Sequence, residues 1–527
     1  MNKILIKKTY LYATEFFAGM SVMAVELGAS RLLAPYFSSS QIVWTIIIGT
    51  IMIAMAMGNA IGGRWADKDD NPDKLYKRLI IAALWIVAIP FLGKFVIIGI
   101  SLLLVKTVST NFLITAAFLA CMIIFVFPLF LLGTVTPSLI KYSTKNLEES
   151  GRVAGNLGAF NTTGSIIGTF LPTFVTIPAV GTAVTFHIFS GIILLIGIIY
   201  FVSSKRKIGL VVASGIIFII FVIAGNTLGF AFWEKGIVLE DESVYNYLLV
   251  KEDDESITLS TNVLFGVQSV KMKNDELTDM YYDYASVAPL MSGMVNSEDE
   301  GDILVLGMGT GTFATQCYKY YPKANITGVE IDNKIKDISR EYFDLEEEIK
   351  VYEYDGRAYL NVDDKKYDVI MVDAYQDITI PFQMSTVEFF EMVKSHLKEN
   401  GVMVVNLNMY TKTPGDINDY LIGSIDNVFD KCFSIDVEDS CNREVFAFND
   451  KADSTKWREN FSEIDNNYLR KMARKVSSNL KEYKRSKHIL TDDKAPVELL
   501  GMKTIDVLIN EEIENVKSID LDFLEDK

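Results

Sequence analysis

The stretch 305–332, VLGMGTGTFATQCYKYYPKANITGVEID, decides the fold of the second half of this chain. An apolar strand runs into a turn with three glycines, an amphipathic helix follows, and a second strand ends on a carboxylate. Gly307, Gly309 and Gly311 lack side chains, so the backbone of the turn can approach a ligand closely where the helix begins. Glu330, which ends the second strand, can accept both hydroxyls of a ribose. The pattern predicts a nucleoside-binding βαβ unit.

Further strands continue this alternation. IKVYEYD, YDVIMVDAY and GVMVVNLN are separated by amphipathic helices, and CFSIDVED and REVFAFND have the spacing of a hairpin. Five βα units followed by an antiparallel pair predict an α/β doubly wound sheet, of the class I methyltransferase (Rossmann-like) type, over 276–527. The short alternating strands before it predict a small β subdomain over 233–275.

The strand ends carry the candidate chemistry. Asp355 and Gly356 end the third strand, in position for the amino group of an adenine, and Asp373 ends the fourth and faces the reaction centre. The carboxyl ends of parallel strands meet at one edge of a sheet, which is where this fold binds ligands. No GxxxxGK[ST] sequence is present in the chain, so the motif for a triphosphate is missing.

The first 232 residues predict a helical membrane bundle of about seven spans. The apolar runs of spanning length lie at about 10–35, 41–63, 79–105, 112–140, 155–177, 181–202 and 208–232. Pro90 and Lys94 interrupt the third run, so its ends are the least certain. Glu26 and Arg31 lie in the first run, where ionisable residues either pair near the interface or serve a function. Gly164 and Gly168 predict close helix packing in the fifth.

The basic residues of this half predict its orientation. They cluster before the first run and after the second, fourth and sixth, which places the N-terminus in the cytoplasm by the positive-inside rule. An odd number of spans then places 233–527 outside the cell, whereas one miscounted span would place it inside.

Composition excludes several classes of function. Residues 1–230 contain 17 Lys and Arg against 8 Asp and Glu, and the remainder contains 33 against 59. An acidic aqueous half argues against binding to nucleic acid, whose phosphates need neutralising cations. The four Cys and three His form no CxxC or His/Cys cluster, so no metal site is expected.

Along 237–410 the aqueous half is similar to spermidine synthases, the polyamine aminopropyltransferases, and the whole chain resembles their membrane-fused branch. The matching segments are ESVYN (242–246), FGVQS (265–269), YDYASVAPL (282–290), VEID, YDGRAYL, VDAYQDITIP and LTDDKAPVE (490–498). The resemblance implies a nucleoside site, a donor of the decarboxylated S-adenosylmethionine type or S-adenosylmethionine itself as co-substrate, no tightly bound cofactor, and pairing of two copies through this domain.

The resemblance also assigns roles. Asp373 would be the general base that deprotonates the attacking amine. The nucleoside would be held by Asn246, Gly307, Gly309, Gly311, Glu330, Asp355, Gly356 and Pro381. The amine would be held by Gln268, Asp283, Thr310, Tyr375 and Asp377. The chain departs from the family where Thr310 replaces an Asp, Tyr284 a Glu and Asp283 a His.

Three functions remain open at this stage. The first is a membrane-anchored aminopropyltransferase-like enzyme acting on a small amine, with membrane lipid as its surroundings. The second is an S-adenosylmethionine-dependent methyltransferase on the same fold. The third is a transporter or receptor for polyamines or other small molecules, with the aqueous domain as a nucleoside-binding module.

Overall fold

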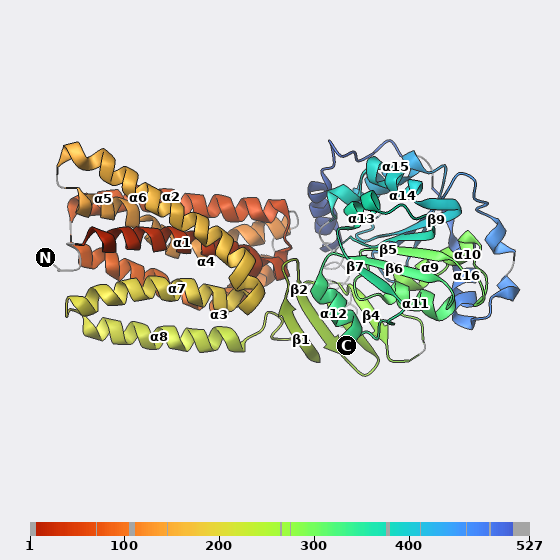
Figure 1. Ribbon diagram of the computed structural model, residues 1–527, viewed down its shortest axis with the longest axis horizontal. Coiled ribbons are helices and arrows are strands. Elements are labelled where there is room, and N and C mark those ends of the chain that lie inside the picture. Colours follow the sequence, from red (N-terminus) through yellow and green to blue (C-terminus); the bar gives the residue numbers. More distant parts are fainter. Residues whose placement is uncertain are drawn as a thin grey trace, which may run out of the picture. The chain divides into compact units, whose positions relative to one another are not determined.

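The computed structural model describes residues 7–509 apart from 70, 105–110, 145, 264–265, 275, 376–379, 412, 460 and 484–485. The chain divides into two compact units, residues 1–234 and 235–527. The first unit is helical, and the second combines strands with helices (Figure 1).

The first unit is a bundle of long apolar helices. They are α1 (Lys8–Phe37), α2 (Gln41–Lys68), α3 (Pro72–Leu104), α4 (Phe112–Gly133), α5 (Val135–Ser143), α6 (Ser150–Leu171), α7 (Ile177–Ser203) and α8 (Ile208–Thr227), with η1 (Leu147–Glu149) before α6 and η2 (Pro172–Thr176) between α6 and α7. Within the described residues, six helical stretches are long and apolar enough to cross a membrane.

One of these six stretches combines two of the apolar runs. Ser150–Ser203 has 54 residues, and a straight helix of that length would extend about 80 Å, far beyond a bilayer. The backbone leaves helical geometry at Gly181, where φ is 78° and ψ is 172°. In Figure 1, α6 and α7 run in opposite directions. The runs at 155–177 and 181–202 lie on either side of this break.

The third run is less irregular than its sequence suggests. α3 continues through Pro90 and Lys94 as one helix of 33 residues. The ammonium of Lys94 is buried, donates a hydrogen bond to the carbonyl of Leu228 and lies 4.5 Å from the ring centroid of Phe230. The charge that interrupts the apolar run is therefore compensated inside the unit.

Small residues bring α6 against α1, as the sequence predicts. A Cβ on Gly164 would lie 2.0 Å from the carbonyl oxygen of Phe16, and one on Gly168 would lie 2.1 Å from that of Met20. The adjacent carboxylate of Glu15, which the sequence analysis did not single out, is fully buried and accepts hydrogen bonds from Thr136 at 2.5 Å and Asn161 at 2.9 Å.

The second unit begins with a four-stranded antiparallel sheet. Its strands are β1 (Ile237–Glu242), β2 (Tyr247–Glu252), β3 (Ser256–Ser260) and β4 (Ser269–Met272), paired in that order. One face of this sheet packs on α12 (Asn333–Glu341) through Leu248, Val250 and Ile338. The small sheet thereby lies beside the end of β6, which carries Glu330.

An eight-stranded sheet follows, in the order β12-β10-β11-β9-β8-β5-β6-β7. Its strands are β5 (Asp302–Leu306), β6 (Asn325–Glu330), β7 (Lys350–Glu353), β8 (Tyr367–Val372), β9 (Leu397–Leu407), β10 (Lys431–Asp436), β11 (Arg443–Phe448) and β12 (Lys481–Glu482). β5 to β9 pair in parallel and β10 to β12 are antiparallel. The chain crosses from β7 back to β8 beside β5, which creates the switch point where such sheets bind ligands.

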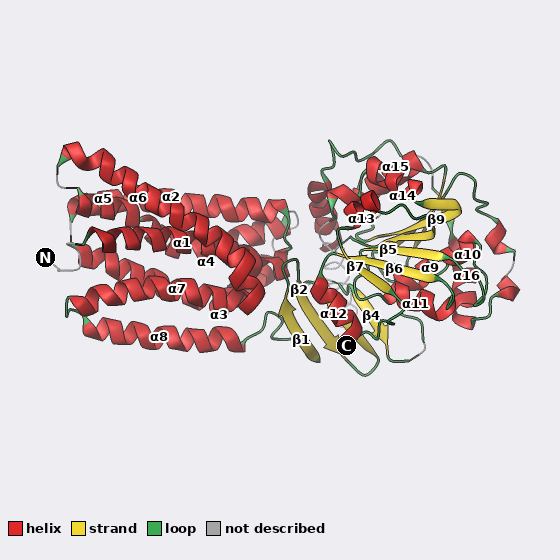
Figure 2. Ribbon diagram, viewed as in Figure 1, coloured by secondary structure: helices red, strands yellow, loops and turns green. Residues whose placement is uncertain are grey.

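Helices cover both faces of this sheet (Figure 2). Besides α12 they are α9 (Tyr281–Ala285), α10 (Ala288–Ser292), α11 (Thr312–Tyr320), α13 (Gly356–Val362), α14 (Val387–Ser395), α15 (Ile417–Val428) and α16 (Asn467–Asn479), with short η3 (Phe382–Met384), η4 (Lys456–Arg458) and η5 (Phe461–Glu463) turns. The predicted doubly wound, methyltransferase-like fold with a terminal hairpin is therefore confirmed.

Candidate functional site

The glycine turn lies at the carboxyl end of β5. Gly307, Gly309 and Gly311 have φ angles of 77°, 57° and 87°, which side chains would disfavour. A Cβ on Gly307 would lie 2.6 Å from the Cα of Ala374. The missing side chain therefore lets the turn pack directly against the residue that follows Asp373.

Glu330 closes the other side of this turn. Its carboxylate accepts hydrogen bonds from the backbone N–H of Gly309 at 2.8 Å and of Asp332 at 3.0 Å. Burial raises the pKa of Glu330 to about 7, against the lowering effect of these two donors. The carboxylate is thus fixed at the end of β6 by the turn that it faces.

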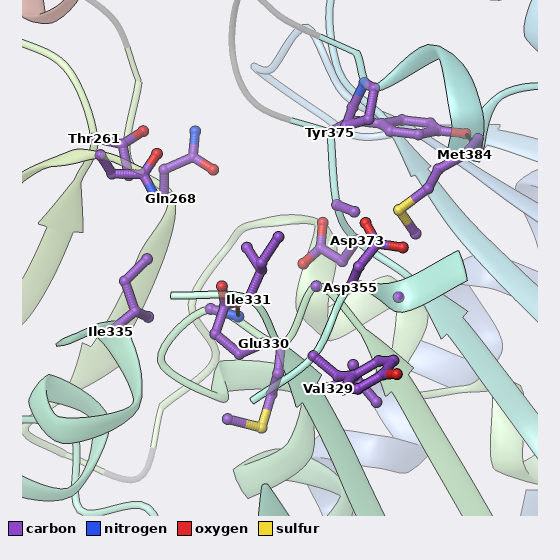
Figure 3. Close-up of a pocket in the computed structure, with 18 of the residues that line it drawn as sticks. Thr261, Gln268, Val329, Glu330, Ile331, Ile335, Asp355, Asp373, Tyr375 and Met384 are labelled. Atoms are coloured by element: carbon purple, nitrogen blue, oxygen red, sulfur yellow. Dashed lines mark hydrogen bonds between the residues drawn. The ribbon is translucent and has the colours of Figure 1, made fainter. Parts of the chain in front are cut away.

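A cavity opens at this edge of the sheet. In Figure 3, Thr261 and Gln268 lie on one side, Tyr375 and Met384 on the other, and Glu330 and Asp373 between them. Ten of the residues predicted from the sequence line this cavity: Asn246, Gln268, Gly307, Gly309, Glu330, Asp355, Gly356, Asp373, Tyr375 and Pro381. Its lining combines apolar side chains with a few polar groups, which suits a small molecule such as a nucleoside.

Asp373 is held by donors from two other elements. The hydroxyl of Tyr281 in α9 donates to one oxygen at 2.8 Å, and the amide of Asn406 in β9 donates to the other at 3.2 Å. Asn442 in turn donates to the carbonyl oxygen of Asn406 at 2.8 Å, which orients that amide. Burial raises the pKa of Asp373 to about 7, and the nearby Glu330 adds to the rise.

Residues from two connections, β7–α13 and β8–α14, complete the far side of the cavity. Asp355 caps α13 by accepting a hydrogen bond from the backbone N–H of Ala358 at 2.8 Å. The hydroxyl of Tyr375 donates to the carbonyl of Met384 at 2.9 Å. The ring of Tyr375 is therefore fixed against the 381–384 turn, and its hydroxyl is engaged within the protein.

Three predicted residues do not line this cavity, and a fourth cannot be placed. Asp283 does not line this cavity; it is buried and accepts a hydrogen bond from Gln316 at 2.7 Å. Thr310 lines a neighbouring cavity on the other side of the turn. Gly311 begins α11 without lining either cavity. Asp377 lies outside the described residues.

Asn246 lines the cavity, but its side-chain amide already forms a hydrogen bond within the protein. Its amide donates to Asp332 at 2.9 Å, and Asp332 also accepts a hydrogen bond from the hydroxyl of Ser243. Asn246 therefore fixes the loop between β1 and β2 against the end of β6. A direct contact with a ligand would be an additional role.

Sequence reasoning missed both residues that hold Asp373. Tyr281 immediately precedes the segment that was recognised, and Asn406 is a polar residue inside the otherwise apolar strand VMVVNL. A buried amide in such a strand needs a hydrogen-bond partner, so the polar residue within the apolar strand could have indicated this contact. Thr261, Gln383 and Met384 also line the cavity and carried no signal of their own.

The charge of the cavity is one-sided. Among its described lining residues, Glu330, Asp355 and Asp373 carry carboxylates and none is Lys, Arg or His. Carboxylates in a partly buried cavity favour a cationic ligand, because each isolated negative charge is costly to bury. The same carboxylates would repel a ligand that carries a negative charge.

The C-terminal segment braces the cavity from outside. Arg357 in α13 donates to both oxygens of Asp492, at 2.8 and 2.6 Å, and to the carbonyl of Gln383 at 2.9 Å. Thr386 donates to Asp492 at 2.7 Å. The segment 490–498 thus connects α13 to the turn that carries Pro381, although the two segments are more than 100 residues apart in sequence.

Comparisons with known proteins find similarity to one family of enzymes. The model of the spermine/spermidine synthase domain matches residues 288–439. A probable polyamine aminopropyl transferase of Bifidobacterium longum is 48% identical over 333 residues, which cover 60% of this chain and 73% of the relative. The polyamine aminopropyltransferase of Vibrio vulnificus is 25% identical over 226 residues, covering 41% and 74%. The crystal structure of a probable spermidine synthase from Corynebacterium glutamicum has a TM-score of 0.37 at 20% identity, covering 47% of this chain and 90% of that one.

Proposed function

We propose that this chain, which belongs to the polyamine aminopropyltransferase family, transfers an aminopropyl group from decarboxylated S-adenosylmethionine to a small amine. It is a transferase, and the helical unit anchors it in a membrane. The observation that carries the proposal is a cavity at the switch point of the sheet with a buried carboxylate at its centre and no cationic lining residue among those described.

The charge of the cavity supports a decarboxylated donor. S-adenosylmethionine carries a carboxylate that decarboxylated S-adenosylmethionine lacks, and that anion would need a cationic or N–H partner next to the reacting sulfonium. The decarboxylated donor presents only positive charges, which Asp373 and Glu330 favour. This difference separates aminopropyl transfer from methyl transfer on the same fold.

Different residues of the cavity bind the nucleoside and deprotonate the acceptor. Glu330 accepts hydrogen bonds from the ribose hydroxyls. Asp355, Gly356 and Pro381 enclose the adenine ring. Asp373 takes a proton from the ammonium of the acceptor, because an alkylammonium has no lone pair until it loses one. The amine nitrogen then forms a bond to the methylene carbon next to sulfur, the carbon–sulfur bond breaks, and methylthioadenosine leaves.

The arrangement around Asp373 suits this role. Tyr281 and Asn406 hold the carboxylate in one orientation, and a pKa of about 7 makes it an efficient base near neutral pH. A base is expected to face the attacked carbon from the side opposite the leaving sulfur. The location of Asp373 at the end of β8, beside the glycine turn, supports this role.

The test is turnover by the purified full-length protein in detergent. We expect release of methylthioadenosine with decarboxylated S-adenosylmethionine and an amine, and no turnover with S-adenosylmethionine. Asp373→Asn is expected to lower kcat by at least about 100-fold and to keep the affinity for methylthioadenosine within a few-fold. Asp364→Asn, an exposed aspartate shortly before β8, is the matched control.

Two results would contradict the proposal. Methyl transfer from S-adenosylmethionine would identify a different donor. Loss of methylthioadenosine binding in Asp373→Asn, with catalysis by the remaining bound fraction unchanged, would mean that Asp373 holds the nucleoside and is not the base.

A further inference from the structure

A second buried carboxylate lies behind Asp373 and has no assigned role. Glu444 in β11 is fully buried, and neither of its oxygens has a hydrogen-bond partner among the described residues. A carboxylate in this state costs several kcal/mol unless it is neutral or a cation accompanies it. Such a group in the interior needs an explanation.

The sheet places Glu444 in line with the proposed base. Val372 pairs with Val405, so the next residues, Asp373 and Asn406, are neighbours on β8 and β9. Asn406 pairs with Glu444 on β11. The three side chains therefore form one row across adjacent strands, with Asp373 and Glu444 about 10 Å apart along the backbone row.

The same face of the sheet carries all three residues. Met371, Val404 and Phe446, each two positions from a member of the row, pack together in one apolar cluster with Tyr281 and Tyr284 of α9. Side chains two residues apart on a strand share a face. The row Asp373–Asn406–Glu444 is thus covered by α9, which packs against both β9 and β11.

Glu444 has no cationic partner among the described residues. Burial and the nearby Asp373 raise the pKa of Glu444 well above its ordinary value. The lining of the cavity, which does not include Glu444, contains no cationic side chain among its described residues, and Asp283 is already engaged by Gln316. A cation that enters from the side of Asp373 would relieve two buried carboxylates at once.

We propose that Glu444 holds the ammonium at the far end of a diamine acceptor while Asp373 receives the proton of the near amine. This assignment rests on the aminopropyl transfer proposed above and makes Glu444 a specificity-determining residue. A short alkane diamine places two cations along the row, with its methylenes under Tyr281 and Tyr284. A monoamine would leave Glu444 unpaired and is expected to be a poor acceptor.

Substitutions at Glu444 test this assignment by specificity. Glu444→Gln is expected to raise KM for the preferred diamine about 10- to 100-fold, the cost of one charge-assisted hydrogen bond. The ratio of kcat/KM for diamine over n-alkylamine of equal chain length should fall by a similar factor. Affinity for methylthioadenosine should stay unchanged. Glu438→Gln removes an exposed carboxylate, paired with Lys475, from the same hairpin and should change none of these values.

A shorter carboxylate provides a second test that keeps the charge. Glu444→Asp withdraws the carboxylate by one methylene, so the preferred diamine should become one methylene longer. An unchanged length preference in Glu444→Asp, or an unchanged diamine-to-monoamine ratio in Glu444→Gln, would overturn the assignment. A purely structural role would lower stability and activity with all amines equally.

Binding separates this assignment from the proposed reaction. Calorimetry measures diamine affinity for the full-length protein saturated with methylthioadenosine, without turnover. If wild type turns over no amine but binds a diamine that Glu444→Gln loses, the proposed reaction fails and the site at Glu444 stands. If wild type binds no diamine, or both proteins bind it equally, the site is refuted.

Discussion

At the scale of single residues, the site depends on carboxyl groups that the fold keeps from water. Asp373 and Glu330 lie at the ends of β8 and β6, on either side of β5, and burial raises the pKa of each to about 7. Specific donors oppose that rise: Tyr281 and Asn406 at Asp373, and two backbone N–H groups at Glu330. The balance between burial and these donors decides which groups are ionised near neutral pH.

Removal of the Tyr281 hydroxyl should change the pH dependence of the reaction. This hydroxyl stabilises the ionised form of Asp373, so Tyr281→Phe raises the pKa of Asp373 above about 7. A base acts when it is ionised, so the rising limb of kcat/KM against pH should move upward by about one unit. Measurement between pH 5 and 9 checks this, with Tyr318→Phe on α11 as control. A downward or absent shift would mean that Tyr281 does not stabilise the ionised base.

Glu330 should link nucleoside binding to stability. Glu330→Gln is expected to weaken binding of methylthioadenosine about tenfold or more, because a charge-assisted hydrogen bond to ribose is lost. Unchanged affinity, measured by calorimetry with exposed Glu341→Gln as control, would mean that other residues hold the ribose.

The same variant has a predicted pH signature. Between the unfolded pKa of 4.5 and the folded pKa of about 7, the native state binds more protons than the unfolded state. Stability therefore falls as pH rises through this window, by up to about 3 kcal/mol from Glu330. Glu330→Gln removes that contribution, so the unfolding midpoint of the C-terminal unit should fall less between pH 4.5 and 8 than in wild type.

At the scale of helices and strands, the sequence predicts features that depend on neighbouring residues and misses those that depend on contacts between distant segments. Apolar strands ending in glycine or carboxylate identified β5, β6 and β8 and placed Glu330 and Asp373 correctly. The row of Asp373, Asn406 and Glu444 could not be predicted from the sequence, because it depends on the pairing of β9 with both β8 and β11. The position of Asp283 depended on the packing of α9 against α11, and no local pattern encodes that contact.

The brace formed by the C-terminal segment should support the cavity from a distance. Asp492→Ala removes the partner of both Arg357 and Thr386 and should free the turn that carries Pro381. We expect several-fold weaker methylthioadenosine binding and a larger effect on KM for the donor than on kcat. Asp493→Ala, at the next and equally exposed position, is the control, and an equal effect from both variants would contradict a specific brace.

At the scale of the whole molecule, the charged segments of the helical unit gather at one end. Lys141 pairs with Asp67 at 3.1 Å, which joins the C-terminal ends of α5 and α2. Arg206 and Lys207 lie 3.8 and 4.0 Å from Asp73, which joins the α7–α8 connection to the start of α3. α8 starts at this end and runs about 30 Å away from it.

This arrangement predicts the side of the membrane on which the aqueous unit lies. The positive-inside rule places the basic end in the cytoplasm, and the break at Gly181 makes α6 and α7 two separate passes. α8 then ends on the opposite side. A single cysteine at exposed Asn274, in a variant without the four native cysteines, should be labelled in intact cells by a membrane-impermeant maleimide. The donor would then have to be supplied outside the cytoplasm. Labelling only after lysis would mean that one of these helices does not cross, and that the site shares a compartment with the basic end.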